Sequence, residues 1–286
     1  MRILFYPIGG LANRMRAIDS AVNFSKAYNC KLTIFWIRDR GMNCDFNRIW
    51  KPVSFIKEAT GRISGFFFYL QRRFVFIRWV LKILERWRIL RVFVDEYKGK
   101  DEMLYSYVKS ASGDIRYWFL VIMTCEDFFP GQSFRSDLFQ LQPEIAERVK
   151  QETEGFDENT IGVHIRRSDH IHSIEHSPLE LFEEYMLNEL SNCPEAKFYI
   201  ASDDEAVKEH FKQNPQWKSK VIFSEGCLLR DSQEGILQAV TEFYALSRTR
   251  KILGSYWSTF SELASRIGYL NLMVVKNELR GLTEKE

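Results

Sequence analysis

The feature that most constrains this chain is a short apolar run ending in two arginines and an acid, Ile161-Gly162-Val163-His164-Ile165-Arg166-Arg167-Ser168-Asp169. Its apolar, β-branched start predicts a buried strand. Open α/β sheets bind ligands at the carboxyl ends of their strands. Guanidinium donors grip phosphate oxygens two at a time, so Arg166 and Arg167 suit a diphosphate there. The alternative is a strand end with ordinary surface salt bridges.

Composition narrows the class of protein. The 286 residues allow two domains, and 45% are hydrophobic, which excludes a disordered chain. With 40 basic and 38 acidic residues, no global field indicates nucleic-acid binding, so any positive site is local. The five cysteines form no CxxC pair, which argues against a zinc site or a disulfide scaffold and fits a reducing cytosol.

Targeting signals are not apparent in the sequence. The first residues, Met1 to Tyr6, run directly into an expected strand without the pattern of a signal peptide. No uninterrupted apolar run is long enough to span a bilayer. We therefore expect a cytoplasmic protein.

A glycine-rich turn follows the first expected strand, at residues 2–8. The turn is Gly9-Gly10-Leu11-Ala12-Asn13-Arg14, and a helical pattern continues to about Tyr28. Free N–H groups in such a turn can hold an anion or a sugar hydroxyl, which makes Gly10, Asn13 and Arg14 candidate substrate-binding residues. A tight strand-to-helix turn without a ligand is the alternative. A second strand at 31–36 predicts a parallel α/β layer.

Two further strand ends in the second half carry polar groups. Residues 197–202 form a strand that opens into Asp203 and Asp204, and the strand at 251–254 leads to Ser258-Thr259-Phe260-Ser261. One carboxylate could accept hydrogen bonds from a base or ribose, and the hydroxyl-rich turn could bind an anion. Ordinary helix caps are the alternative for both. A hinge near 155–159 predicts two domains, 1–155 and 156–286.

The stretch about 64–94 is a basic aromatic insertion. Between residues 66 and 94, aromatic side chains alternate with arginines and lysines, and Glu85 is the only acid up to residue 94. Such a segment can lie in a membrane interface. A core helix and strand edged with arginines is the reading we favour. RNA binding ranks third, because no recognition motif accompanies the patch.

The loop after the arginines carries His170, His172, Glu175 and His176. Three histidines beside a carboxylate raise the question of a metal. Their spacing matches no known zinc pattern, so we expect no metal. Ser177-Pro178 should then start a helix.

Taken together, these motifs resemble the inverting fucosyltransferase superfamily, which includes α-1,6-fucosyltransferases and protein O-fucosyltransferase-like enzymes. His164 to Asp169 matches its His-x-Arg-Arg-x-Asp peptide, and Gly9 to Arg14 is similar to its opening glycine turn. Residues 199–204 and 258–261 complete the resemblance. The stretch between about 40 and 140 has no counterpart that we can place.

The resemblance implies an α/β fold with two Rossmann-like domains facing a cleft, the GT-B arrangement. GDP-fucose would be the donor, held mainly by the second domain, with no metal and no other cofactor. Arg166 would stabilise the leaving GDP, while His164 and Arg167 shape the site. Asp203 and Asp204 would reach guanine or ribose or hold the arginines. The phosphates would be enclosed by Ser258, Thr259, Phe260 and Ser261. Asn13 and Arg14 would lie on the opposite wall of the cleft.

An inverting transfer also needs a base for the acceptor hydroxyl. Glu175 is the first candidate, and Asp169 is the second, since an acid beside two arginines is more typical of an ion pair. We expect fucose transfer to a saccharide, and one fitting acceptor is a lipid-linked surface-polysaccharide precursor. The protein would reach this acceptor at the inner face of the membrane, which residues 66–94 would contact. The alternatives are another nucleotide sugar as donor, or a binding protein without turnover.

Overall fold

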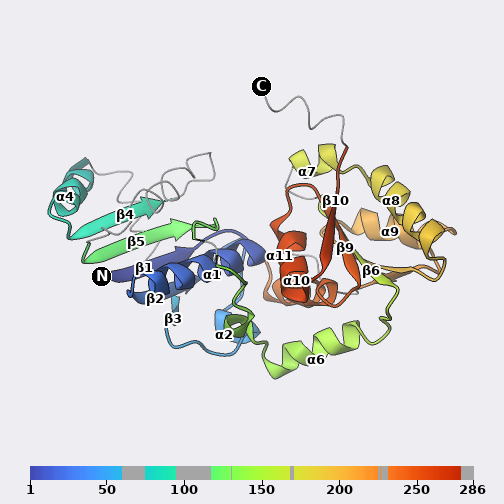
Figure 1. The fold of residues 1–286 in the computed structure, drawn as a ribbon, viewed down its shortest axis with the longest axis horizontal. Helices are drawn as coiled ribbons and strands as arrows, with labels where there is room; N and C mark the ends of the chain where they lie inside the picture. Colours follow the sequence, from blue (N-terminus) through green and yellow to red (C-terminus); the bar gives the residue numbers. More distant parts are fainter. Residues whose placement is uncertain are drawn as a thin grey trace. The chain divides into compact units, whose positions relative to one another are not determined.

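The structure, a computed structural model, describes residues 1–59, 75–94, 117–129, 131–167, 171–224, 226 and 231–277. Contacts divide the chain into two compact units, Met1–Gln142 and Pro143–Glu286, each with its own sheet (Figure 1). The expected α/β class is confirmed. The expected boundary at 155/156 would place helix α6 (Pro143–Glu152) in the first domain. Contacts place it in the second unit, because Ile145 and Val149 are buried and α6 packs on α10 (Gln233–Leu246).

The first unit is built on a five-stranded parallel sheet with the order β3-β2-β1-β5-β4. Its strands are β1 (Arg2–Pro7), β2 (Lys31–Ile37), β3 (Ile56–Ala59), β4 (Leu90–Val94) and β5 (Phe119–Thr124). Its helices are α1 (Leu11–Ala27), α2 (Phe46–Ile49), α4 (Val75–Arg86) and the 3-10 turn η1 (Ser136–Phe139). The central strand β1 leads directly into the glycine turn and α1, as the sequence predicts.

The second unit has a parallel sheet of order β10-β9-β6-β7-β8. Its strands are β6 (Thr160–Ile165), β7 (Lys197–Ser202), β8 (Val221–Phe223), β9 (Lys251–Ser255) and β10 (Asn271–Val275). Besides α6 and α10, its helices are α7 (Ile171–His176), α8 (Leu179–Asn192), α9 (Glu205–Gln213) and α11 (Thr259–Gly268). The chain runs outward from β6 to β8 and then returns to β9, so the strand order reverses between β6 and β9. That reversal is where open α/β sheets bind ligands.

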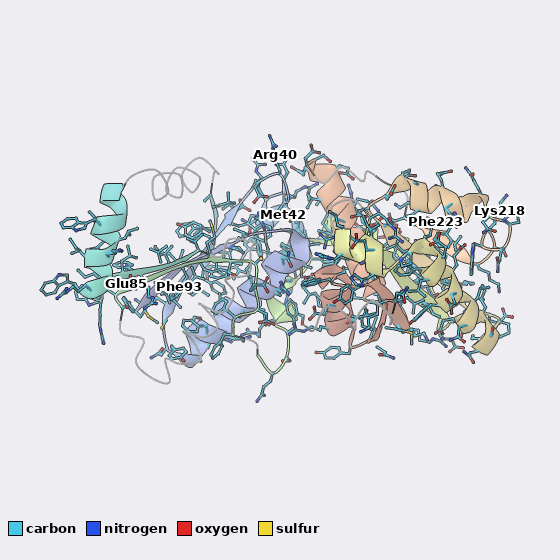
Figure 2. The ribbon with its side chains drawn as sticks, turned by 90° about the horizontal axis from the view of Figure 1, so that it is seen from above. Arg40, Met42, Glu85, Phe93, Lys218 and Phe223 are labelled. Atoms are coloured by element: carbon cyan, nitrogen blue, oxygen red, sulfur yellow. The ribbon has the colours of Figure 1, made fainter. Side chains whose placement is uncertain are left out.

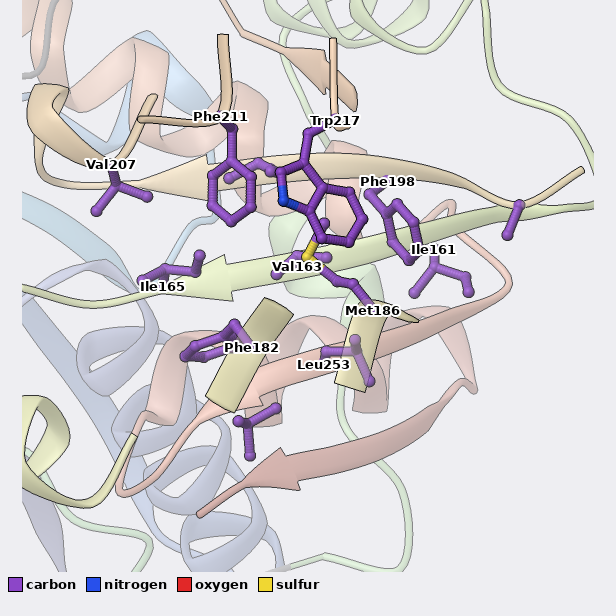
Figure 3. Packing of buried hydrophobic residues seen from close by; sticks show 13 residues of the cluster. Ile161, Val163, Ile165, Phe182, Met186, Phe198, Val207, Phe211, Trp217 and Leu253 are labelled. Atoms are coloured by element: carbon purple, nitrogen blue, oxygen red, sulfur yellow. The ribbon is translucent and has the colours of Figure 1, made fainter. Parts of the chain in front are cut away.

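The two faces of β6 have different neighbours. Ile161, Val163 and Ile165 belong to one apolar cluster with side chains of α8 and α9 and with Trp217 (Figure 3). On the other face, Gly162 lies so close to the end of α10 that an added Cβ would come within 2.8 Å of Leu246. Because successive side chains of a strand point to opposite faces, this pattern fixes the face of each residue that follows β6.

A buried ion pair ties α9 to α10. Lys208 and Glu242 are 2% and 6% exposed, and Nζ of Lys208 lies 3.3 Å from Oε1 of Glu242. Lys208 also donates to the carbonyl of Ser224 at the end of β8 (3.1 Å). Burial raises the pKa of Glu242 to about 7, although Lys208 counteracts this rise. Lys208 and Glu242 therefore connect α9, α10 and the end of β8 through buried charged groups.

We expect Lys208→Met to lower the free energy of unfolding by about 3–5 kcal/mol, because it leaves Glu242 buried without its cation. Lys208→Met combined with Glu242→Leu should recover most of that loss, since an apolar pair needs no counter-charge. Urea unfolding of the three proteins measures both effects. Equal losses in the single and double variants would show that the pair is not coupled.

Candidate functional site

The carboxyl edge of the second sheet is assembled around Arg166. Its backbone N–H donates to Oγ of Ser255 at the end of β9 (2.9 Å), and that hydroxyl donates to the carbonyl of His164 (3.2 Å). The backbone N–H of Arg167 points the opposite way and donates to Oδ1 of Asp203 after β7 (2.7 Å). The extended course of β6 thus continues through both arginines, which are fixed to the two neighbouring strands.

Arg167 is turned toward α7 and α8. Its Nη2 donates to the carbonyl of Ser177 (2.8 Å), and Nη1 lies 3.5 Å from the carbonyl of Ile174. Burial lowers the pKa of Arg167, and the carboxylates of Glu180, Asp203 and Asp204 counteract that shift. The guanidinium of Arg167 therefore holds the chain around α7, whereas Arg166, two residues after His164, continues the opposite face.

His164 and the start of α11 lie on the face of β6 opposite the apolar cluster. The His164 ring stacks on Phe260 at 4.7 Å, and Nδ1 lies 3.3 Å from Oγ of Ser258. Phe260 in turn contacts Phe243 of α10 edge-on at 5.1 Å. Ser258 occupies the cap position of α11 without a side-chain hydrogen bond to the helix. The helix start, with Thr259 half-buried, thus lies on the face of β6 that Arg166 continues.

Close packing of α11 on β9 depends on two small residues. Ser261 is 1% exposed, and an added Cβ at Gly254 would lie 2.5 Å from its Oγ. The same hydroxyl donates to the carbonyl of Ser258 (3.2 Å). Ser261 therefore fixes the helix start against β9, a structural role that the sequence could not separate from phosphate binding.

Asp203 and Asp204 have separate roles. Asp203 accepts the hydrogen bond from the backbone of Arg167, so it helps to hold the arginine segment, as the resemblance allowed. Asp204 is the N-cap of α9 and accepts from the backbone N–H of Ala206 (2.9 Å). The helix-cap reading is thus confirmed for Asp204.

The two candidate bases lie in the segment after the arginines. Glu175 is exposed on α7, whose Ser173 donates to the carbonyl of Tyr256 after β9 (2.7 Å). Asp169 lies outside the described residues, as does His170. His172 lies 5.6 Å from the ring of Trp257. The expected helix after Ser177 begins at Leu179, with Pro178 at its cap position.

The side chain of Arg14 fixes the glycine turn of the first unit through hydrogen bonds. Gly9 has a φ of 83°, which a glycine adopts without strain, and Gly10 is extended at the cap of α1. Arg14 is 1% exposed, and its Nε donates to the carbonyl of Gly9 (2.8 Å). Its Nη1 donates to the carbonyl of Ile37 and its Nη2 pairs with Asp39, both at 2.5 Å. These bonds give Arg14 a structural role in the turn.

Asn13 differs from Arg14. Its side chain is half-buried, and its Oδ1 is buried without a hydrogen-bond partner among the described residues. Buried polar atoms normally have a partner, so this oxygen marks a position where a ligand group could donate. Of the three turn residues, Asn13 thus keeps the strongest claim to substrate contact.

Three anchoring residues were not predicted. The hydroxyl of Ser255 accepts a hydrogen bond from the backbone N–H of Arg166, and the carbonyl of Ser177 accepts one from the guanidinium of Arg167. Asp39, in a loop after β2, pairs with Arg14. A serine at a strand end and an aspartate in a loop carry no distinctive sequence signal. Their roles follow only from strand order and chain path.

The described residues contain no group of three or more His, Cys, Asp or Glu side chains that could hold a metal ion. Among these same residues, no helix combines the length and apolarity needed to cross a bilayer.

The fold is that of known fucosyltransferases. NodZ α-1,6-fucosyltransferase soaked with GDP-fucose aligns with a TM-score of 0.64 at 15% identity, over 98% of this chain and 95% of that one. A mutant of Arabidopsis thaliana FUT1 in complex with GDP gives 0.62 at 16%, over 98% and 71%, and POFUT1 in complex with GDP gives 0.53 at 13%, over 96% and 98%. A NodZ structure from Bradyrhizobium gives 0.62 at 16% identity, over 98% and 95%. No family profile and no curated protein matches the sequence.

We expect Arg14→Lys to lower the free energy of unfolding by about 3 kcal/mol, because a lysine cannot reproduce the bonds to two carbonyls and a carboxylate. Thermal or urea unfolding measures the loss. Arg38→Lys is the matched control, since Arg38 forms an exposed pair with Asp45 at 3.3 Å and should change stability by less than about 1 kcal/mol. A similar small effect at both positions would contradict the structural role of Arg14.

Proposed function

We propose that this protein is an inverting glycosyltransferase that transfers fucose from GDP-fucose to a saccharide acceptor. The observation that carries the proposal is the contact of His164 with Phe260 and Ser258 at the start of α11, beside the strand-order reversal. The alternation of β6 directs Arg166 to the same face. The fold shared with fucosyltransferases that were solved with GDP or GDP-fucose supports it. In this proposal the two units form the walls of a GT-B cleft.

Charge development at the donor explains the choice of residues. As the bond from the sugar to the diphosphate breaks, negative charge builds on GDP and the sugar becomes oxocarbenium-like. A cation and helix N–H groups that are already in position stabilise that state more than the ground state. Arg166 supplies the cation, and the start of α11 at Thr259 and Phe260 supplies N–H groups.

The remaining site residues orient these groups. His164 stacks on Phe260 and so fixes the ring beside the helix start. Asp203 and Arg167 hold the course of the chain on the β7 side, and Asn13 contributes its buried oxygen from the first unit. We propose that the reaction needs no divalent metal, with the cationic side chain doing the work of charge stabilisation.

Glu175 is the proposed base. Attack by the acceptor hydroxyl on the anomeric carbon inverts its configuration and releases a proton, which a carboxylate can accept. Glu175 stands on α7, which is fastened to the end of β9 through Ser173 and lies next to the carbonyls that bind Arg167. Asp169 is the second candidate. The acceptor class that we propose is a lipid-linked surface-polysaccharide precursor in the cytoplasm.

We expect Arg166→Ala to weaken GDP and GDP-fucose binding by about 10- to 100-fold, the loss of a charge-assisted phosphate contact. Calorimetric titration in the presence of EDTA measures it. Arg167→Ala is the matched control, because it removes the same side chain one residue away on the opposite face. It should lower the melting temperature more than Arg166→Ala does, because it breaks the hydrogen bond from Arg167 to the carbonyl of Ser177. Binding of UDP-glucose in place of GDP-fucose, or binding that requires a divalent metal, would refute the donor assignment.

We expect Glu175→Gln to lower fucose transfer by a hundredfold or more while GDP-fucose binding is unchanged, because the amide cannot accept the proton. Product formation and donor titration on one preparation separate the two effects. Glu184→Gln, a substitution of another glutamate in the same unit, serves as control. Transfer at the normal rate in Glu175→Gln would assign the base elsewhere, with Asp169 next to be tested. Donor affinity without any transfer in the wild type would indicate a binding protein.

A further inference from the structure

The amino edge of the first sheet carries a basic aromatic surface that the proposed donor chemistry does not use. α4 ends in a turn that leads into β4, and Trp118 immediately precedes the neighbouring strand β5. The backbone joins them, since the N–H of Trp118 donates to the carbonyl of Arg88 (3.2 Å) and that of Phe119 to Ile89 (2.9 Å). We define the amino-edge patch by the following six residues: Trp79, Lys82, Arg86, Trp87, Arg88 and Trp118.

Large aromatic side chains of the patch lie in solvent. Trp79, Trp87 and Trp118 are 59%, 73% and 74% exposed, whereas the intervening apolar residues of α4 are partly buried and Phe93 of β4 is 7% exposed. The segment 75–94 thus forms a helix and a strand of the sheet, as the core reading predicts, and also presents an outer aromatic surface. The part of the basic aromatic segment at residues 66–74 lies outside the described residues.

Positive charge surrounds these rings. Lys82 and Arg86 follow Trp79 by three and seven positions, so all three share one face of α4. Arg2 and Lys31 begin the adjacent strands β1 and β2, are paired in register, and are exposed at the same edge. Glu85 is the only acid within the described stretches 1–2, 28–31, 79–90 and 117–118, and it pairs with Arg91 at 3.5 Å.

We propose that the amino-edge patch docks this protein on an anionic lipid surface. Indole rings with one apolar and one polar side settle at the level of lipid headgroups, and lysines and arginines beside them meet the negative headgroups. Tryptophans interspersed with cations on a projecting helix and strand edge fit that layer. Figure 2 shows side chains projecting from α4 near the labelled Glu85. The cations select a negatively charged surface over a neutral one.

The patch lies at the opposite end of the strands from the glycine turn. Arg2 starts β1 and Gly9 follows its end, so a strand of six residues, about 20 Å, separates the two edges. A lipid surface bound at the amino edge therefore leaves Asn13 accessible. The inference is independent of the donor assignment, because vesicle binding requires none of the proposed donor-site residues.

The test is sedimentation of the full chain with phosphatidylcholine vesicles containing about one-third phosphatidylglycerol, and with pure phosphatidylcholine. The wild type should bind the anionic vesicles selectively. Lys82→Glu with Arg86→Glu should weaken binding by at least about 25-fold, since each cation near the surface contributes about fivefold. Trp87→Ser with Trp118→Ser should also weaken it, while GDP titration of every variant gives the wild-type result.

The matched control is Lys150→Glu with Lys218→Glu, which makes the same change in charge on exposed lysines of the second unit. It should retain most of the binding to anionic vesicles. The inference is overturned if the wild type binds neither kind of vesicle or both equally, or if the control loses as much binding as the patch variant. It is also overturned if the wild type forms a dimer that Trp87→Ser with Trp118→Ser dissociates, because the patch then holds a second copy of the chain.

Discussion

The alternation of side chains along β6 organises the second unit. Ile161, Val163 and Ile165 enter the apolar cluster with α8 and α9, and the opposite face meets α10 and α11. The backbone N–H groups of the next two residues, donated to Ser255 and Asp203, extend that alternation beyond the strand. Two adjacent arginines are thereby assigned to opposite sides of the sheet.

The two arginines therefore have different surroundings. Arg166 continues the face of His164, where Ser258 and Phe260 begin α11. Arg167 binds carbonyls around α7 and is partly desolvated there. In the fold the two arginines thus differ: the side chain of Arg167 is fixed at α7, whereas the alternation of β6 directs Arg166 to the face of His164. The same distinction holds in the first unit, where Arg14 fastens the turn and Asn13 keeps an unsatisfied buried oxygen.

Polar anchors also explain how the sheet edges are built. Ser255 joins β9 to β6, and Lys208 joins α9 to the end of β8 and to α10. Each of these groups is buried, so its hydrogen bonds must be satisfied internally and its geometry is narrowly defined. The amino edge of the first sheet is different in kind, since its tryptophans and cations are largely exposed. The edges of the two sheets thus differ, since one is fastened by buried polar groups and the other presents exposed rings and cations.

By itself, the sequence determined the features that depend on local pattern. The apolar run 161–165, the glycine turn after β1 and the acidic cap at Asp204 follow from periodicity, backbone freedom and capping, and they predict the parallel α/β architecture. Only the tertiary structure decided the outward path from β6 to β8, the return to β9, and hence the partners of Arg166, Arg167 and Arg14. Two of those partners lie far away along the chain, Ser255 at 89 residues from Arg166 and Asp39 at 25 residues from Arg14, and Ser177 is reached only after the chain has passed through α7. Local pattern cannot specify them, because strand order and helix packing are set by the burial of the whole core.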